Sequence, residues 1–153
     1  MKLKQISKKD QLKIKEVYFD SVISIDENIY SKEQKFAWAS QAWENSEFEK
    51  SLLEGKGLML IRKNLIIGFA TRFPENRLSL FYVRGIFKRK GYGSMIIDSI
   101  ERDALKSGIN KLNTEASLLS YRLFLKRNWE IIRKEKVNIR GLTFERYKMY
   151  KIL

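Results

Sequence analysis

The sequence predicts a mixed α/β (α+β) domain, in which helices pack on a central mixed sheet. Two patterns predict this fold class. Some segments repeat apolar residues every three or four positions, as amphipathic helices do, and others are short apolar runs between turn residues, as strands are. The two kinds of segment alternate along all 153 residues. A chain of this length can bury one proper core, so we expect residues 1–153 to form a single domain.

The first half of the chain predicts a strand, three helices and then three strands. The expected strand covers residues 2–6, and the expected helices cover residues 9–24, a segment N-capped by Ser31, and residues 46–53. Residues 58–61 and 65–71 then predict a hairpin, and the turn Pro74-Glu75-Asn76 leads into a strand over residues 77–83.

A glycine-rich loop with three cations, Lys88-Arg89-Lys90-Gly91-Tyr92-Gly93-Ser94, follows this strand and opens the most amphipathic helix of the sequence. In that helix apolar residues recur every four positions as far as Ala104, and Gly108 ends it as a left-handed C-cap. Glycines let the backbone approach a ligand, and the free N–H groups of a helix N-terminus attract anions. The loop therefore predicts a site for the phosphates of a small molecule.

The last third of the chain predicts a strand, a helix and a hairpin. The strand covers residues 111–115, Ser117 N-caps a helix that runs to about residue 127, and residues 129–139 and 143–152 pair around a turn at Arg140-Gly141. The complete order is βαα(α)βββαβαββ, which fits the mixed sheet.

The chain contains no histidine and no cysteine. This composition excludes a Ser-His-Asp triad, a cysteine nucleophile and a zinc site built from His or Cys, so acid–base chemistry falls to Asp, Glu, Tyr, Lys or water. The acidic residues do not cluster, and we expect no metal. The lack of cysteine suits a reducing compartment, and no apolar run is long enough to span a membrane. We therefore expect a cytoplasmic protein without a membrane partner.

The formal net charge is +13, from 31 Lys and Arg residues against 18 Asp and Glu residues. An anionic ligand, a nucleic acid or a membrane surface would explain it, and so would a lysine-rich solvated surface. The cations are spread along the chain without a block of five or six, and no DNA- or RNA-binding signature accompanies them. We interpret the bulk charge as solvated surface and do not expect nucleic acid as a partner.

Three kinds of phosphate-binding loop have glycine patterns that can be compared with this one. A Walker A loop needs Lys and then Ser or Thr after its last glycine, but Tyr92 follows Gly91. A dinucleotide fingerprint needs a third glycine where Ile96 stands. The third pattern, [Q/R]-x-x-G-x-[G/A], is the acyl-CoA loop of the GNAT acetyltransferase superfamily. Residues 88–93 resemble it, with Lys88 in place of Gln or Arg.

The resemblance to the GNAT superfamily extends over nearly the whole chain and is closest to its YafP-like bacterial subgroup. The segments that carry it are Tyr30-Ser31-Lys32-Glu33-Gln34, Ala37-Trp38-Ala39, Ile67-Gly68-Phe69-Ala70, Thr114-Glu115-Ala116-Ser117, Phe124, Asn128-Trp129, Val137, Arg140-Gly141 and Met149. The resemblance implies a GNAT-type fold, with a mixed sheet of about seven strands that splays between strands 4 and 5 and is flanked by helices. It also implies an N-acetyltransferase that uses acetyl-CoA as co-substrate and acetylates a primary amine of a small molecule or protein. A monomer or a homodimer would fit.

The same resemblance assigns residues to the acetyl-CoA site. In the superfamily the pantetheine arm pairs with the fourth strand and the pyrophosphate lies on the glycine-rich loop. The implied cofactor-binding residues are Phe81, Tyr82, Val83, Lys88, Arg89, Lys90, Gly91, Tyr92, Gly93, Ser94, Ser117 and Phe124. Ser117 stands where the family usually has Asn, and it is equally well explained as an N-cap.

The superfamily transfers the acetyl group directly to the amine, which agrees with a chain that lacks Cys and His. A backbone N–H of the fourth strand can polarise the thioester carbonyl. Phe124 stands where the family commonly has the tyrosine that protonates the leaving thiolate, so the candidate acids are Tyr121, Tyr147, water or the amine itself. Glu75 is the first candidate for the base, with Glu33 and Glu115 as lesser candidates.

The acceptor pocket of the superfamily is built from the first two helices and the last hairpin, which implies Tyr30, Gln34, Trp38 and Arg140 as substrate-binding residues. Two other functions stay open. A catalytically weak acyl-CoA-binding or regulatory module would explain the phenylalanine at position 124. A nucleic-acid-binding domain is suggested by the net charge alone.

Overall fold

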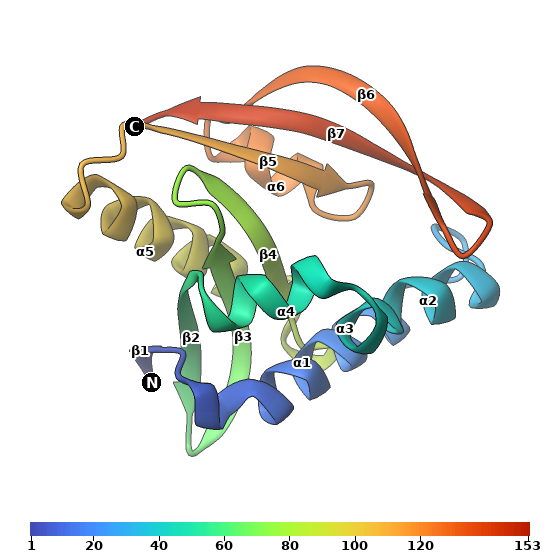
Figure 1. Ribbon diagram of the computed structural model, residues 1–153, viewed down its shortest axis with the longest axis horizontal. Coiled ribbons are helices and arrows are strands. Elements are labelled where there is room, and N and C mark those ends of the chain that lie inside the picture. The colour runs from blue at the N-terminus through green and yellow to red at the C-terminus, as the bar shows by residue number, and fades with distance from the viewer.

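The computed structural model describes residues 1–153, and its centre is one seven-stranded sheet in the order β1-β2-β3-β4-β5-β7-β6 (Figure 1). The strands are β1 (Lys2–Gln5), β2 (Lys56–Arg62), β3 (Leu65–Arg72), β4 (Arg77–Val83), β5 (Lys111–Ser117), β6 (Glu130–Ile139) and β7 (Leu142–Ile152). All neighbouring strands are antiparallel except β4 and β5, which are parallel. The expected mixed sheet of about seven strands is confirmed.

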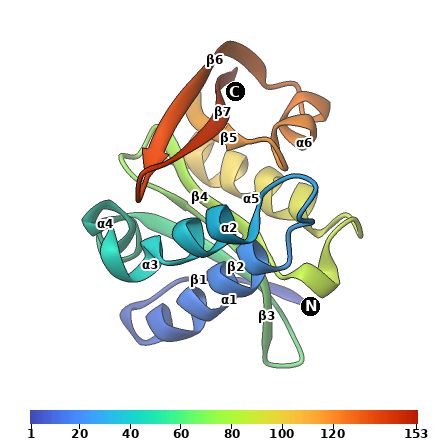
Figure 2. The same ribbon diagram turned by 90° about the vertical axis from the view of Figure 1, so that its right-hand side faces the viewer.

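The helices divide between the two faces of the sheet. They are α1 (Gln11–Ile23), α2 (Lys32–Ala39), α3 (Gln41–Glu44), α4 (Ser46–Leu53), α5 (Tyr92–Lys106) and α6 (Tyr121–Lys126), with short 3₁₀ turns η1 (Lys8–Asp10) and η2 (Gly85–Phe87). The α1–α4 face buries a core that includes Tyr18 and Phe69, and the α5–α6 face buries a second core that includes Ile96 and Trp129. In Figure 2 α1–α4 gather below the tip of the β6–β7 hairpin. None of the helices has the length and hydropathy to cross a bilayer.

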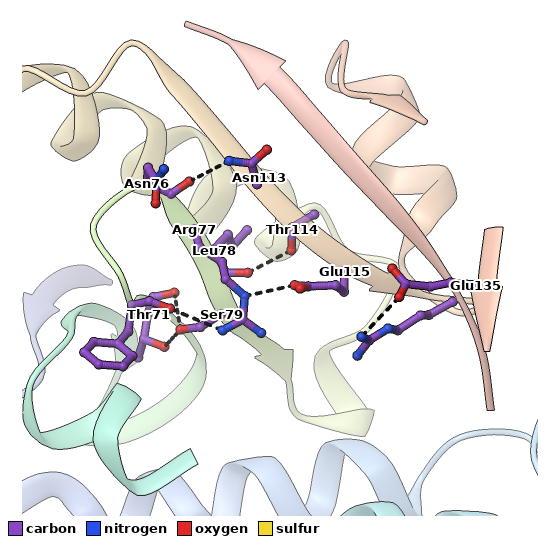
Figure 3. Close-up of polar contacts among 11 residues, drawn as sticks. Thr71, Asn76, Arg77, Leu78, Ser79, Asn113, Thr114, Glu115 and Glu135 are labelled. Carbon is purple, nitrogen blue, oxygen red and sulfur yellow. Dashed lines mark hydrogen bonds and ion pairs between the residues drawn. The ribbon is translucent and has the colours of Figure 1, made fainter. Parts of the chain in front are cut away.

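The sheet opens at the junction of β4 and β5. Only two residue pairs join these strands, Arg77 with Asn113 and Leu78 with Thr114. The Thr114 hydroxyl donates to the Leu78 carbonyl at 2.8 Å (Figure 3). The Asn113 backbone N–H donates to the Asn76 carbonyl at 2.9 Å. Beyond this vertex the strands diverge: in Figure 1 β5, β6 and β7 cross the top of the molecule while β2 and β3 run steeply below them. The splay expected between strands 4 and 5 is confirmed.

A β-bulge in β4 begins directly after the vertex. Arg72 of β3 pairs with Leu78 and Thr71 pairs with Leu80, so Ser79 is an extra residue without a partner on β3. Its hydroxyl lies 2.9 Å from the Thr71 hydroxyl, which anchors the bulge (Figure 3). Because side chains alternate along a regular strand, one extra residue puts Leu78 and Leu80 on opposite faces, one in each core.

Helix α5 is the amphipathic helix that the sequence predicts. Ile96, Ile100 and Ala104 are fully buried beneath it. Gly91 precedes the helix with φ of 86°, and Gly108 follows it with φ of 80°, both in the left-handed region that favours glycine. These two glycines set the ends of the helix, and its first turn borders the opening between β4 and β5.

Two predicted N-caps have different outcomes. Ser31 caps α2 as predicted: its hydroxyl accepts from the Gln34 N–H, and its own N–H donates to Gln34 Oε1, which together form a capping box. The N-cap at Ser117 is wrong: β5 continues to Ser117, which pairs with Arg146 of β7, and α6 begins only after Ser120. A serine before a helix fits either role, and the pairing that extends the strand depends on β7, which is distant in the sequence.

Candidate active site

A cleft of about 570 Å³ lies between the separated strands β4 and β5. Its closed end is the vertex at Leu78 and Thr114. One wall is formed by the loop between β4 and α5 with the first turn of α5, and another by the segment from the end of β5 into α6. Residues of α1 and α2, including Trp38, reach the cleft from the opposite face of the sheet. The cleft therefore connects the two faces at the point where the sheet is open.

The loop before α5 presents a row of free backbone N–H groups. None of the six amides of residues 89–94 donates to an acceptor in the protein; the first main-chain bond after them runs from Met95 N–H to the Gly91 carbonyl at 3.3 Å. Such a row, at the positive end of a 15-residue helix, attracts a bound anion. Gly91, Gly93 and Ser94 of this row line the cleft.

Gly93 has a second role, which is to leave space. A Cβ atom at this position would lie 3.0 Å from Leu123 Cδ2 and 3.2 Å from Phe81 Cζ. The Phe81 ring in turn packs edge-on against Phe124, with ring centroids 5.6 Å apart. A side chain at position 93 would thus narrow the cleft between β4 and the glycine-rich loop of residues 88–94.

Three cations line the cleft, Lys88 and Arg89 in the loop and Lys126 at the end of α6. Lys88 also ties the loop to α1, because its Nζ donates to the Ser21 carbonyl at 2.7 Å and lies 3.2 Å from the Ser24 hydroxyl. Burial lowers the pKa of Lys88 to about 8, although nearby Asp20 acts in the opposite direction. The loop end of the cleft therefore suits an anion, and a bound anion would favour the charged form of Lys88.

Most residues expected to bind the cofactor meet at this cleft. Phe81, Tyr82, Val83, Lys88, Arg89, Gly91, Gly93, Ser94, Ser117 and Phe124 line it. Lys90 and Tyr92 do not; Lys90 is exposed, and the Tyr92 ring packs against Phe87 with centroids 5.9 Å apart. The edge of β4 that faces β5 is unpaired after Leu78, so residues 79–83 offer free main-chain groups to a ligand in the cleft.

The three expected catalytic residues lie outside the cleft. Glu75 is in the turn before β4, where its side chain is 60% exposed and lies 3.5 Å from Lys56 Nζ. Tyr121 of α6 packs against Tyr147 of β7, with ring centroids 4.4 Å apart. None of the three lines the cleft.

The four residues expected to bind the acceptor lie together between α2 and the β6–β7 hairpin, but only Trp38 lines the cleft. Tyr30 is buried beside Trp38, and its hydroxyl accepts a hydrogen bond from the Leu118 N–H at 3.1 Å. Gln34 Nε2 donates to the Thr143 carbonyl at 3.1 Å. Arg140 forms an ion pair with Glu44 and lies over the Phe36 ring. The Gln34 and Arg140 contacts fasten the hairpin to the helices, and the Tyr30 contact holds the segment that follows β5.

Tyr82 is the tyrosine that does line the cleft. Its ring packs edge-on against Tyr18, with centroids 4.7 Å apart, and against Trp38. Burial raises the pKa of Tyr82 to about 12, so its hydroxyl keeps its proton at neutral pH. It is a neutral hydrogen-bond donor on the α1–α2 side.

Four residues at or beside the cleft were not expected from the sequence: Ser79, Arg77, Ser120 and Lys126. Ser79 and Lys126 line the cleft, as does Ser120, and Arg77 contacts the cleft residue Glu115 at 3.0 Å. For Ser79 a signal was present: it is a polar residue between two leucines in a strand. Nothing local marks Arg77 or Lys126, because their positions depend on strand and helix packing.

Residues 27–151 match the family model for the acetyltransferase (GNAT) domain. Several solved structures share the fold. A GCN5-related N-acetyltransferase from Rhodopseudomonas palustris superposes with a TM-score of 0.91 at 25% identity, over 99% of this chain and 95% of that one. PaiA N-acetyltransferase from Thermoplasma acidophilum, in complex with coenzyme A, gives 0.74 at 17% identity over 100% of both chains. Ribosomal-protein-alanine N-acetyltransferase from Brucella melitensis gives 0.68 at 18% identity over 100% of both. No curated protein matches the sequence.

Proposed function

The chain belongs to the acetyltransferase (GNAT) family, and from that membership we propose that it is an acetyl-CoA-dependent N-acetyltransferase. The acceptor in this proposal is a primary amine of a small molecule or a protein. Similarity to PaiA, whose structure contains coenzyme A, supports the choice of donor.

One observation carries the proposal: the free amides of residues 89–94 lie at the N-terminus of α5, beside the opening between β4 and β5. Two linked phosphates need several N–H donors in a short arc and compensating positive charge. The loop supplies the donors, and Lys88, Arg89 and Lys126 supply the charge. The pyrophosphate of acetyl-CoA fits both requirements.

The remaining parts of the cleft fit the rest of the donor. The pantetheine arm carries amide groups, which can pair with the open edge of β4 over residues 79–83. This places the thioester toward the vertex, where a free N–H of β4 can stabilise negative charge on the carbonyl oxygen. The amine nitrogen then attacks the thioester carbon, the C–N bond forms and the C–S bond breaks. The nitrogen loses one proton and the CoA thiolate gains one, so the products are the amide and CoA thiol.

Finer assignments belong to the same proposal. The motif segments from Tyr30 to Met149 support the YafP-like bacterial subgroup. A chain without cysteine supports a cytoplasmic enzyme. One sheet that joins both cores supports a single domain over residues 1–153.

A second function, a catalytically weak acyl-CoA-binding module, has one observation in its favour. Phe124 lines the cleft where a tyrosine acid is expected, and neither Tyr121 nor Tyr147 lines it. Such a module would bind the donor but would not turn it over.

The test is release of CoA thiol from acetyl-CoA with an amine panel: ethylamine, trifluoroethylamine, benzylamine, spermidine and a hexapeptide with N-terminal alanine. We expect amine-dependent release, with mass spectrometry showing the acetylated product. Acetyl-CoA should also raise the unfolding temperature. Stabilisation without turnover of any amine would favour the binding module, and no stabilisation would contradict both functions.

A further inference from the structure

Glu115 is the acidic side chain of the active-site cleft. It is the first residue of β5 after the last β4–β5 pair, just as Ser79 is the first residue of β4 after that pair, so Glu115 stands next to the vertex. No other residue that lines the cleft is acidic, and its lining cations are Lys88 and Arg89 of the loop and Lys126 at the end of α6. The cleft is therefore polarised, with cations at the phosphate end and one carboxylate at the closed end.

The Glu115 carboxylate is held by one oxygen and free at the other. Arg77 Nε donates to Glu115 Oε2 at 3.0 Å, and Arg77 Nη1 donates to the Phe73 carbonyl at 3.3 Å (Figure 3). The Arg77 guanidinium is thus held at two of its nitrogens, Nε and Nη1. Glu115 Oε1 has no hydrogen-bond partner in the protein, and the side chain is 22% exposed. A fixed carboxylate with one open oxygen can receive a donor from the cleft.

Charged neighbours on the other strands are engaged elsewhere or stand beside Glu115 without bonding to it. Arg146 of β7 lies 3.5 Å from Glu135 of β6, so these two charges form their own pair. Lys148 is the cross-strand neighbour of Glu115 on β7 and forms no ion pair with it. Arg77 of β4 is the partner that sets the position of the carboxylate.

We propose that the free oxygen of Glu115 binds the acceptor amine in its ammonium form and takes up one proton from it, with Arg77 as the positioning residue. The inference rests on the proposed function. Primary amines are cationic at neutral pH, and a lone pair is needed for attack. One N–H proton moves to Glu115, the nitrogen adds to the thioester carbon, a second proton leaves the nitrogen for the departing CoA sulfur, and Glu115 returns its proton to solvent. The products are the N-acetyl amide, CoA thiol and one released proton.

The geometry favours Glu115 over the other acidic candidates. Glu75 pairs with Lys56 on the surface, and Glu33 is exposed in the first turn of α2; neither lines the cleft. Glu115, in contrast, lines the cleft next to the vertex, the end toward which the thioester must point if the phosphates occupy the loop.

The test compares Glu115→Gln with the matched control Glu135→Gln, which removes a neighbouring carboxylate that does not line the cleft. Two amines serve as probes: ethylamine is cationic at pH 7, whereas trifluoroethylamine is largely uncharged because its fluorines withdraw electrons. For Glu115→Gln, kcat/KM should fall by about 100-fold or more with ethylamine and clearly less with trifluoroethylamine. Glu135→Gln should keep wild-type values with both amines.

Further variants separate catalysis from folding. Glu115→Asp should recover part of the ethylamine activity, and Arg77→Gln should lower kcat with the same dependence on amine basicity. Stabilisation by acetyl-CoA should persist in every variant. Equal losses with the two amines, or no loss in Glu115→Gln, would overturn the role of Glu115 while leaving the proposed function intact. Wild-type protein that acetylates no amine would instead overturn the proposed function, and this inference with it.

Discussion

The two walls of the cleft are built on different principles. The phosphate wall is made of main-chain groups: six free amides, two glycines and a helix N-terminus. The acceptor wall, by which we mean the group between α2 and the β6–β7 hairpin that reaches the cleft only at Trp38, is made of side chains held by other parts of the protein. Tyr30 accepts from the Leu118 N–H, Gln34 donates to the Thr143 carbonyl and Arg140 pairs with Glu44. Under the proposed function, the phosphate wall holds acetyl-CoA, whose phosphates are the same in every reaction. The acceptor wall sets the shape of the site for the amine. The difference implies that substitutions on the two walls should have separable effects.

The largest effect should come from the phosphate wall. Acetyl-CoA at a hundred times its dissociation constant should stabilise the wild-type fold by about 2.7 kcal/mol. Gly91→Glu should abolish this gain, because its carboxylate would enter the space open to the phosphates. The same change should also lower the free energy of unfolding by ~1–2 kcal/mol without ligand, because position 91 has a left-handed backbone conformation. Chemical denaturation with and without acetyl-CoA measures both quantities.

The other end of the same helix provides the control for this change. Gly108 has nearly the same φ and equally open surroundings but lies away from the cleft. Gly108→Glu should therefore cost similar stability and keep the acetyl-CoA gain. A Gly91→Glu protein that responds to acetyl-CoA like wild type would show that the phosphates bind elsewhere.

A smaller effect should appear in the pH dependence of acetyl-CoA binding. Burial holds the pKa of Lys88 near 8 in the free protein, and bound phosphates should raise it. The complex then holds more protons than the free protein between pH 8 and the raised pKa. Affinity should therefore fall as pH rises through this window, by at most one decade per pH unit, or about 1.4 kcal/mol.

Titration calorimetry between pH 7 and pH 9 measures this dependence. Lys88→Met should flatten it, whereas Lys90→Met, which removes an exposed charge of the same loop, should not. A slope that survives in Lys88→Met would assign the proton uptake to another group.

The smallest effect should come from the acceptor wall. Arg140 and Glu44 are each about two-fifths exposed, and exposed ion pairs contribute little stability, so Arg140→Ala should cost less than about 1 kcal/mol. Its loss frees the β6–β7 hairpin from α3, which should change KM for the acceptor amine and leave the acetyl-CoA dissociation constant unchanged. A double-mutant cycle with Glu44→Ala measures the coupling. An equal change in acetyl-CoA affinity would show that the two walls are not independent.

The phosphate wall could be predicted from the sequence better than the rest of the site. The glycine-rich loop and α5 could be predicted because glycine conformation and helix polarity are local properties. The pairing of Arg77 with Glu115 could not, since these residues are 38 positions apart and meet only through the β4–β5 register. For the same reason Tyr121, Tyr147 and Arg140 had the right chemistry for the roles expected of them, but packing placed their side chains against other partners.

Ser79 has a consequence for how this fold tolerates change in length. Up to Leu78, β4 pairs with β5 as well as with β3, and after Ser79 it pairs only with β3. Deletion of Ser79 would remove the bulge and leave two outcomes. Either β4 would pair with β5 beyond Leu78 and close the cleft, or Phe81 and Tyr82 would exchange the faces of the sheet on which they lie. The opening that can admit a ligand therefore depends on the one inserted residue, Ser79.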